Sequence, residues 1–376
     1  MKFQVDRDVL SEAVSWTARS LAPRPPLPIL SGVLIEAKEN KISLSAFDYE
    51  TSASISIEAD VEEAGSALVS GRLLTDIARK LPAAPVVFES ENNKVNLSCG
   101  VSSFTLASMP VDEYPNLPEF PESSGQIRSE EFSQAVSQVA IAASKEDSLP
   151  ILTGVYIEFK GDEITLLATD RYRLAMRIAH WNPEDPNFEA TVLIKSKTLN
   201  DVAKALATGG GIDMAIDTSG KANAIIGFEK DSHKTTSLLV DGEYPPVRSL
   251  FPEETPIYAV VNTQALSEAA SRVSLVAEKN TPLRLEFSEG QVTLHAGTGE
   301  EAQASETLEA ELNGEDITVA FNHQYLLEGL SAFDTPYVRL SFTTPMKPSV
   351  LTGQEELNGE DEQDYRYLVM PVRLPQ

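Results

Sequence analysis

Apolar and polar residues alternate with a period of two in several short stretches of the chain. The clearest are residues 41–46, 52–59 and 94–108, which we expect to form antiparallel strands. In other segments apolar residues recur at helical spacing. Leu10, Phe132 and Leu266 each stand three residues before an alanine within such a segment. A second helical pattern follows at 70–81, 196–206 and 322–333. The mixture predicts an α+β fold.

The chain also repeats itself. "LPILSGVLIE" (27–36) returns as "LPILTGVYIE" (149–158), and "ISLSAFD" (42–48) returns as "ITLLATD" (164–170), both 122 residues later. A third copy at 283–296 is similar to 33–46 at an offset of 250. A period of roughly 125 residues is far longer than that of a solenoid repeat, so each copy is a whole domain. We therefore predict three domains, each with two helices packed on antiparallel sheet, at 1–122, 123–254 and 255–376.

The bulk composition describes an ordinary globular protein of 376 residues, a length that suits two or three domains. The first residues carry charges where a secretion signal needs an apolar core, and one cysteine agrees with a reducing compartment, so we expect a cytoplasmic protein. The net charge of −27 argues against nucleic acid as a partner, because binding phosphates requires Lys and Arg.

No coherent catalytic or metal site is predicted, and no cofactor. The four histidines are scattered, and the single cysteine, Cys99, stands on a predicted strand. "GTGEEA" (297–302) matches a dinucleotide-binding pattern only formally, and we expect a turn at a strand end. Asp48 and Asp170 occupy equivalent places in two repeats. They suggest turn or capping residues rather than an acid–base pair, because a pair must lie within one site.

Basic residues repeat on the second predicted helix. Arg72 and Arg79, with Lys80 beside the latter, correspond to Lys197 and Lys204 in the next copy. The apolar residues expected on the opposite side of the helix are Leu73, Leu74, Ile77, Leu199, Val202 and Leu206. Copy three has Asn322 and Gly329 at the matching places. The cations form either an ordinary solvated face or a selected basic surface. If such domains were arranged around an axis with these helices facing inward, a selected basic surface would line the central hole with positive charge.

Several stretches in order resemble one family along essentially the whole length: "MKFQVDRDVL", "RPPLPIL", "NLPEFP", "LATDRYRLAM", "LVDGEYPPV" and "YLVMPVRL". The chain resembles the beta subunit of bacterial DNA polymerase III, the beta sliding clamp. The resemblance implies a head-to-tail homodimer that forms a ring of six domains around duplex DNA. It implies no catalysis in the chain itself, since nucleotidyl transfer and 3′–5′ exonuclease activity would belong to other proteins of the replication complex.

The resemblance also implies contacts with DNA phosphates, which are independent of base sequence. Arg24, which precedes the first LPIL stretch, and Arg72 match family contacts. Lys145, in the loop before the second LPIL stretch, also matches a family contact. Glu146 and Asp147 make this loop less basic than expected. With the repeated cations, the predicted DNA surface comprises Arg24, Arg72, Arg79, Lys80, Lys145, Lys197 and Lys204.

Family partners bring a short apolar peptide to a pocket between the second and third domains. Such partners are the replicative polymerase, the clamp loader, repair polymerases, and mismatch-repair or ligase proteins. The matching residues are Leu152, Thr169, Arg171, Tyr172, Arg173, Leu174, Pro245, Arg248, Leu250, Asn322, Tyr325, Met346, Pro348, Val369, Met370, Pro371, Val372, Arg373 and Leu374. An apolar cleft with a few donors suits peptide capture. From the residues alone, 367–374 is better interpreted as an ordinary terminal core strand, and only the resemblance favours the peptide site.

Three departures from the family pattern affect this pocket. Arg171 replaces a small residue, so the rim should be bulkier and more basic. Pro375 and Gln376 extend beyond the usual last leucine. Residues 353–364 contain many acids, and we expect a mobile, solvated loop there. At the implied dimer contact Phe104 and Leu106 would meet Leu275, and Ser274 should make that interface softer.

Two other function classes compete with a DNA clamp. An acidic, repeat-built scaffold that binds proteins without encircling DNA would explain the charge. An enzyme using the duplicated acids is the weaker rival. Retention on circular DNA separates the scaffold from the clamp, and substitution of Asp48 and Asp170 tests the enzyme.

Overall fold

The computed structural model describes residues 1–22, 24–91, 93–217, 224–277, 281–297 and 302–373. The chain divides into two compact units. The first comprises 1–129, 182–185 and 204–239, and the second comprises 130–181, 186–203 and 240–376. The central part of the chain thus contributes to both. Among the described helices, none is long and apolar enough to cross a membrane.

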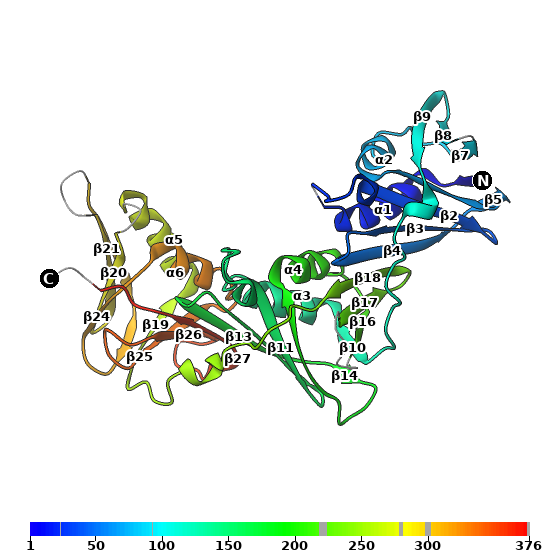
Figure 1. Ribbon diagram of the computed structural model, residues 1–376. Coiled ribbons are helices and arrows are strands. Elements are labelled where there is room, and N and C mark those ends of the chain that lie inside the picture. Colours follow the sequence, from blue (N-terminus) through cyan, green and yellow to red (C-terminus); the bar gives the residue numbers. More distant parts are fainter. Residues whose placement is uncertain (23, 92, 218–223, 278–280, 298–301, 374–376) are drawn as a thin grey trace. The chain divides into compact units, whose positions relative to one another are not determined.

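The first unit is built on one sheet of fourteen strands, all of whose pairings are antiparallel. Its order is β14-β10-β16-β17-β18-β4-β3-β2-β6-β9-β8-β7-β1-β5. The strands are β1 (Lys2–Val5), β2 (Gly32–Lys38), β3 (Lys41–Phe47), β4 (Thr51–Glu58), β5 (Asp60–Glu63), β6 (Gly65–Ser70), β7 (Val86–Glu91), β8 (Lys94–Cys99), β9 (Ser102–Met109), β10 (Gly125–Arg128), β14 (Asn182–Pro183), β16 (Gly211–Ile216), β17 (Ile225–Lys230) and β18 (His233–Leu238). Helices α1 (Arg7–Thr17) and α2 (Gly71–Ala78) pack beside each other (Figure 1).

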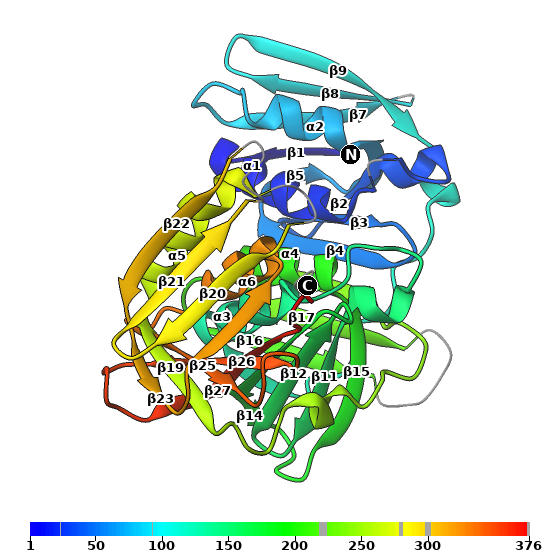
Figure 2. The ribbon, with the colours of Figure 1, turned by 90° about the vertical axis from the view of Figure 1, so that its left-hand side faces the viewer.

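The second unit contains two antiparallel sheets. The larger has the order β15-β11-β12-β13-β27-β26-β25-β19-β23 and the smaller the order β22-β21-β20-β24. The strands are β11 (Gly154–Lys160), β12 (Glu163–Thr169), β13 (Arg173–His180), β15 (Glu189–Lys195), β19 (Ile257–Asn262), β20 (Leu283–Ser288), β21 (Gln291–Ala296), β22 (Ala304–Glu309), β23 (Glu311–Asn313), β24 (Ile317–Phe321), β25 (Tyr337–Phe342), β26 (Ser349–Gln354) and β27 (Asp361–Val369). Figure 2 shows helices α5 (Thr263–Val273) and α6 (His323–Leu330) beside β20–β22. Helices α3 (Ser129–Ala140) and α4 (Ser196–Ala205) come from the central part of the chain.

The three predicted copies share one strand register. Val33 pairs with Val69, Val155 with Ile194, and Leu283 with Phe321. A one-residue slip would turn every buried side chain outward, so identical pairing places the same side chains in the core of each copy. Each copy also has two helices: α1 and α2, α3 and α4, α5 and α6. The predicted α+β class and the three-fold repeat are confirmed.

Side-chain caps begin the first helix in copies one and three. The Asp6 carboxylate accepts the backbone N–H groups of Asp8 and Val9, and so caps α1. The Asn262 side chain caps α5 in the same way through the Ala265 N–H. Leu10, Phe132 and Leu266 are all buried, as their helical spacing predicts.

The second helices agree with the prediction except at two points. Leu73 was expected on the buried side of α2 but is 47% exposed. The strand register and the helix caps, Ser70 before α2 and Asn322 before α6, align Gln324 with Arg72 and Ser331 with Arg79. The sequence match with Asn322 and Gly329 was therefore shifted by two residues. Copy three still lacks the basic pair.

Asp48 and Asp170 are turn residues. The Asp48 carboxylate accepts from the N–H groups of Glu50 and Thr51, and the Asp170 carboxylate accepts from those of Tyr172 and Arg173. Cys99 is a buried strand residue whose thiol donates to the carbonyls of Pro82 and Ala84. Both roles are structural, as the sequence indicates.

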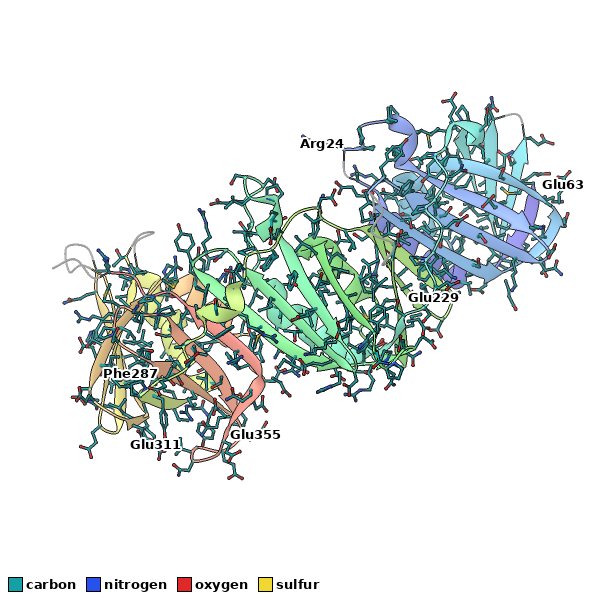
Figure 3. All side chains as sticks on the ribbon, turned by 60° about the horizontal axis from the view of Figure 1, so that its bottom comes forward. Arg24, Glu63, Glu229, Phe287, Glu311 and Glu355 are labelled. Atoms are coloured by element: carbon teal, nitrogen blue, oxygen red, sulfur yellow. The ribbon has the colours of Figure 1, made fainter. Side chains whose placement is uncertain are left out.

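The acidic segment 353–364 is more ordered than predicted. Gly353 and Gln354 end β26, and 361–364 begin β27, so only a short turn joins the strands. The Gln354 side chain is buried and donates to the carbonyls of Glu356 and Leu357, which fixes the turn. Figure 3 shows Glu355 on this turn. The expected loop is therefore a β-hairpin. "GTGEEA" begins directly after β21, and its residues 298–301 lie outside the described part of the chain.

Candidate peptide-binding site and DNA surface

The turn between β12 and β13 positions the centre of the candidate peptide site. The Asp170 carboxylate holds the N–H groups of Tyr172 and Arg173, and the Thr169 hydroxyl donates to the Arg173 carbonyl at 2.6 Å. This tight turn puts Arg171 at a φ of +81°, in the left-handed region. Arg171 and Tyr172 are consequently exposed, while Arg173 and Leu174 point into the protein.

Arg173 is a buried cation held by two carboxylates. Its Nε donates to Asp170 Oδ2 at 3.0 Å, and its Nη1 donates to Glu328 Oε2. The guanidinium lies over the Tyr325 ring, 4.5 Å from its centroid, and the Tyr325 ring in turn stacks with that of Tyr172 at 6.2 Å. Charge pairs and ring contacts thus fix the aromatic side chains of this site relative to one another.

The ionisation of this cluster follows from its partners. Burial lowers the pKa of the Arg173 guanidinium, but the Tyr367 hydroxyl and the Glu328 and Asp170 carboxylates outweigh burial and raise it. Partial burial raises the pKa of Glu328, but the hydrogen bond and charge of Arg173 outweigh burial and lower it overall. Both groups are therefore charged at neutral pH.

An apolar cluster underlies the site. It consists of Leu167, Leu174, Met176, Val247, Phe251, Val350 and Leu368, all buried, with Tyr156 and Tyr244 packed against it. The two tyrosine rings stack at 5.2 Å. Burial raises the pKa of the Tyr244 hydroxyl, so it remains protonated. A dense floor of this kind holds the surface residues above it in fixed positions.

Large apolar side chains are exposed among the predicted site residues. Tyr172 and Leu250 are each 53% exposed, Met346 is 51%, Met370 is 38% and Val372 is 36%. Soluble proteins seldom leave so many large apolar groups uncovered in one candidate site unless something binds them. The arrangement suits capture of an apolar segment, with methionines that adapt to varied side chains.

The C-terminal segment "YLVMPVRL" (367–374) was interpreted either as a core strand or as part of the peptide site, and the structure contains features of both. Tyr367, Leu368 and Val369 are buried residues of β27, which pairs with β13. After the strand, the Met370 N–H donates to the Tyr172 carbonyl at 2.8 Å and the Val372 N–H donates to the Ala320 carbonyl at 2.7 Å. The segment is thus a core strand up to Val369 and an exposed rim from Met370. Leu374 lies outside the described residues.

The remaining predicted peptide residues lie in the same compact unit. Leu152 lies in the short helix Pro150–Thr153, and its carbonyl accepts the Ser144 N–H. Pro245 precedes the short helix Val247–Leu250, where Arg248 pairs with Glu158 at 3.5 Å. Asn322 caps α6, and Met346 and Pro348 lie between β25 and β26. One unit therefore contains every described member of the set.

Sequence reasoning missed two groups in this site. Glu328 holds Arg173, and its only sequence signal is the helical spacing from Gln324, which donates to the same carboxylate at 3.1 Å. Arg366 lies over the Phe251 ring, 4.6 Å from its centroid. Alternation along β27 places Arg366 on the opposite face from Tyr365 and Tyr367, but nothing in the sequence indicates the ring that it contacts.

The predicted DNA-contact residues are all exposed: Arg24, Arg72, Arg79, Lys80, Lys145, Lys197 and Lys204. Figure 3 labels Arg24 on the loop that follows α1. Lys145 is paired within the chain, with its Nζ 3.4 Å from Glu328 Oε1. Its side chain is 75% exposed, so this pair is weak and open to exchange.

The three predicted dimer residues differ in exposure. Phe104 on β9 is 38% exposed, and Leu275 is 84% exposed in the short helix Ser274–Val276 that follows α5. Leu106 is only 4% exposed, so it packs within its own unit rather than adding to an exposed patch.

Comparison with known proteins gives a consistent result over the whole chain. Residues 1–118, 126–246 and 248–373 match the family models for the N-terminal, central and C-terminal domains of the DNA polymerase III beta subunit. A beta sliding clamp of Streptomyces coelicolor is 50% identical over 374 residues, covering 100% of both chains. One from Micrococcus luteus is 56% identical over 308 residues, covering 82% of this chain and 98% of the relative.

Solved structures agree. The DNA polymerase sliding clamp of Bacillus subtilis superposes with a TM-score of 0.92 at 27% identity, covering 100% of both chains. A sliding clamp of Pseudomonas aeruginosa bound to griselimycin gives a TM-score of 0.91 at 26% identity, again covering 100% of both chains. The three repeats, their shared register and these full-length matches lead to one conclusion: the chain belongs to the family of the DNA polymerase III beta subunit, the beta sliding clamps.

Proposed function

We propose that the protein is a sliding clamp that encircles duplex DNA and keeps a replicative polymerase on its template. The observation that carries this proposal is the match of all three repeats, end to end, to proteins named beta sliding clamp. The chain supplies a tether, and nucleotidyl transfer belongs to the polymerase that it holds. Retention on DNA then depends on a closed ring rather than on tight binding.

The DNA surface in this proposal comprises Arg24, Arg72, Arg79, Lys80, Lys145, Lys197 and Lys204. Their exposure supports the assignment. In a chain of net charge −27 these cations would attract phosphates locally, while the acidic remainder repels stray DNA. Contacts limited to phosphates are blind to base sequence and weaken as salt rises, which suits a protein that must slide.

The partner site in this proposal is the apolar surface around Tyr172, Leu250, Met346 and Met370. Its exposed apolar groups above a packed floor support capture of a peptide. We propose that the polymerase, the clamp loader, and repair or ligase proteins carry such peptides. A single site per protomer, shared by them, would make their binding to that protomer mutually exclusive.

The proposed ring is a head-to-tail dimer of six repeats. Phe104 and Leu275, exposed on different repeats, support a heterologous contact between two copies. The sheet orders add support, because β22 ends its sheet and 102–107 of β9 pair only with β8 among the described residues. Free strand edges of this kind can join across an interface.

We further propose domain boundaries at 1–122, 123–254 and 255–376, which the sequence repeats and the ranges of the three family models support. As a replication protein it would act in the cytoplasm, at the nucleoid. The rival reading, an acidic scaffold that never encircles DNA, rests on the net charge of −27 and on the absence of the basic pair from copy three.

Retention on circular DNA tests the proposal. The protein is loaded onto nicked plasmid by a bacterial clamp loader with ATP, and DNA-bound protein is separated by gel filtration before and after linearisation. A ring co-elutes with the circle and is lost once the DNA is cut. Leu275→Asp, which places a charge in the proposed contact, should abolish retention. Equal retention on linear DNA, or none on circles, would favour the scaffold.

A further inference from the structure

Arg171 occupies a backbone position that favours glycine. Its φ is +81°, where a Cβ atom crowds the following carbonyl oxygen. A large cation at such a position costs stability that glycine would not cost. Strain retained at the edge of a candidate binding site suggests that the side chain has a task there.

The charges around Arg171 leave it open to a new partner. The partly buried carboxylates of Asp170 and Glu328 are both engaged by Arg173. The Arg171 guanidinium lies 5.7 Å from the centroid of the Tyr172 ring, and its Nη2 is 3.8 Å from Glu146 Oε2. Both side chains of that ion pair are more than half exposed, so water and salt screen the contact.

Arg171 is also continuous with the apolar part of the proposed peptide site. Tyr172, whose ring it covers, stacks with Tyr325, and the Tyr172 carbonyl accepts the Met370 N–H. An apolar surface with a cation at its edge is complementary to an apolar segment with a carboxylate beside it.

We propose that Arg171 is a specificity-determining residue that selects apolar peptides carrying Asp or Glu next to the apolar segment, and that Glu146 takes the place of that carboxylate when no peptide is bound. This proposal rests on the proposed function, because it assigns a preference to the same peptide site. Glu146 shows that a carboxylate can lie against Arg171 while Arg173 keeps both of its own acids.

The expected preference is modest. An exposed ion pair of this kind changes affinity by about two- to fivefold. Glu146→Gln removes the internal competitor, so it should tighten binding of acidic peptides and leave neutral peptides unchanged. A lysine ammonium can also pair with the peptide carboxylate, so Arg171→Lys should retain part of the preference for acidic peptides. Arg171→Gln, which has no charge, should retain none.

A peptide library tests the proposal. Ten-residue peptides carry four central positions randomised over Leu, Met and Phe, with flanks randomised over Ser, Asp and Lys. They are selected on the wild-type protein and on the Arg171→Gln, Arg171→Lys and Tyr172→Asp variants. Asp should be enriched at one flanking position on wild type and lost on Arg171→Gln. A winning peptide and its Asp→Asn twin are then measured by titration calorimetry.

The outcomes separate the inference from the function on which it rests. Apolar peptides enriched equally on wild type and Tyr172→Asp would bind elsewhere, and the proposed peptide site would fall. Enrichment that needs Tyr172 but shows no Asp preference, or the same preference on Arg171→Gln, would overturn only the role of Arg171. Exposed Lys160, which is outside the proposed peptide and DNA sets and is substituted by Gln, serves as the matched control for loss of a surface cation.

Discussion

Replacing Arg173 by methionine should destabilise the second unit strongly. Methionine keeps the unbranched apolar stem of arginine, but it is shorter and removes the cation from between Asp170 and Glu328. The Arg173 side chain is only 2% exposed, and the carboxylates of Asp170 and Glu328 are 11% and 27% exposed. The substitution would therefore leave two partly desolvated anions without the cation that pairs them.

The size of the expected loss of stability depends on which hydrogen-bond and charge partners each carboxylate keeps. Removing one partner of a buried ion pair costs about 3–5 kcal/mol. Here Asp170 retains two backbone N–H donors, and Glu328 retains Gln324 and Lys145. Because these partners remain, we expect the free energy of unfolding to fall by a little less than that range, by about 2–4 kcal/mol.

The tryptophans provide a selective assay. The chain has two, Trp16 in the first unit and Trp181 in the second. In a Trp16→Phe background, urea unfolding followed by fluorescence reports on Trp181 alone. Arg173→Met should lower the urea midpoint, and the exposed control Lys347→Gln should leave it unchanged. A loss below about 1 kcal/mol would refute the view that the cation holds this site together.

Three further perturbations have defined outcomes. Arg171→Gly relieves the positive φ and should raise the free energy of unfolding by up to about 1 kcal/mol, after the loss of glycine entropy is subtracted; a decrease in thermal stability would contradict this. Gly329→Ala places a Cβ against Cε1 of the buried Tyr367 ring, closer than van der Waals contact allows, so we expect the free energy of unfolding to fall by about 1–3 kcal/mol despite the better helix propensity, as measured by the urea midpoint. Because the folded pKa of Glu328 is lowered, its stabilisation is complete above the ordinary carboxyl pKa of 4.5 and disappears as the pH falls through the folded value. The stability difference between wild type and Glu328→Gln should thus be constant near neutrality and shrink below pH 4.5; a constant difference down to pH 3 would count against this assignment.

Much of the fold could be predicted from local pattern. Buried positions such as Leu10 and Phe132 follow helical spacing. The strand pair of Val33 and Val69 recurs as the pair of Val155 and Ile194, at sequence offsets of 122 and 125 residues. Such features depend on interactions between near neighbours or on repetition, and both are visible in a single sequence.

The candidate site was harder to predict because its chemistry depends on contacts between distant segments. Glu328 meets Arg173 across 155 positions of sequence, and nothing in α6 marks that partner. The exposure of Leu73 was mispredicted for a related reason, and the burial of Leu106 was not foreseen. Periodicity says which side of a helix or strand is apolar, but the packing of neighbouring elements decides which apolar residues are covered.

The place of β27 in the nine-stranded sheet has a consequence for biosynthesis. This last strand lies between β13 and β26, and the residues after it bond to Tyr172 and Ala320. Until it leaves the ribosome, β15-β11-β12-β13 and β26-β25-β19-β23 have no strand to join them. A nascent or C-terminally truncated chain therefore cannot complete the exposed rim that Met370 and Val372 supply. If this rim binds peptides as proposed, unfinished copies would not compete for partner proteins.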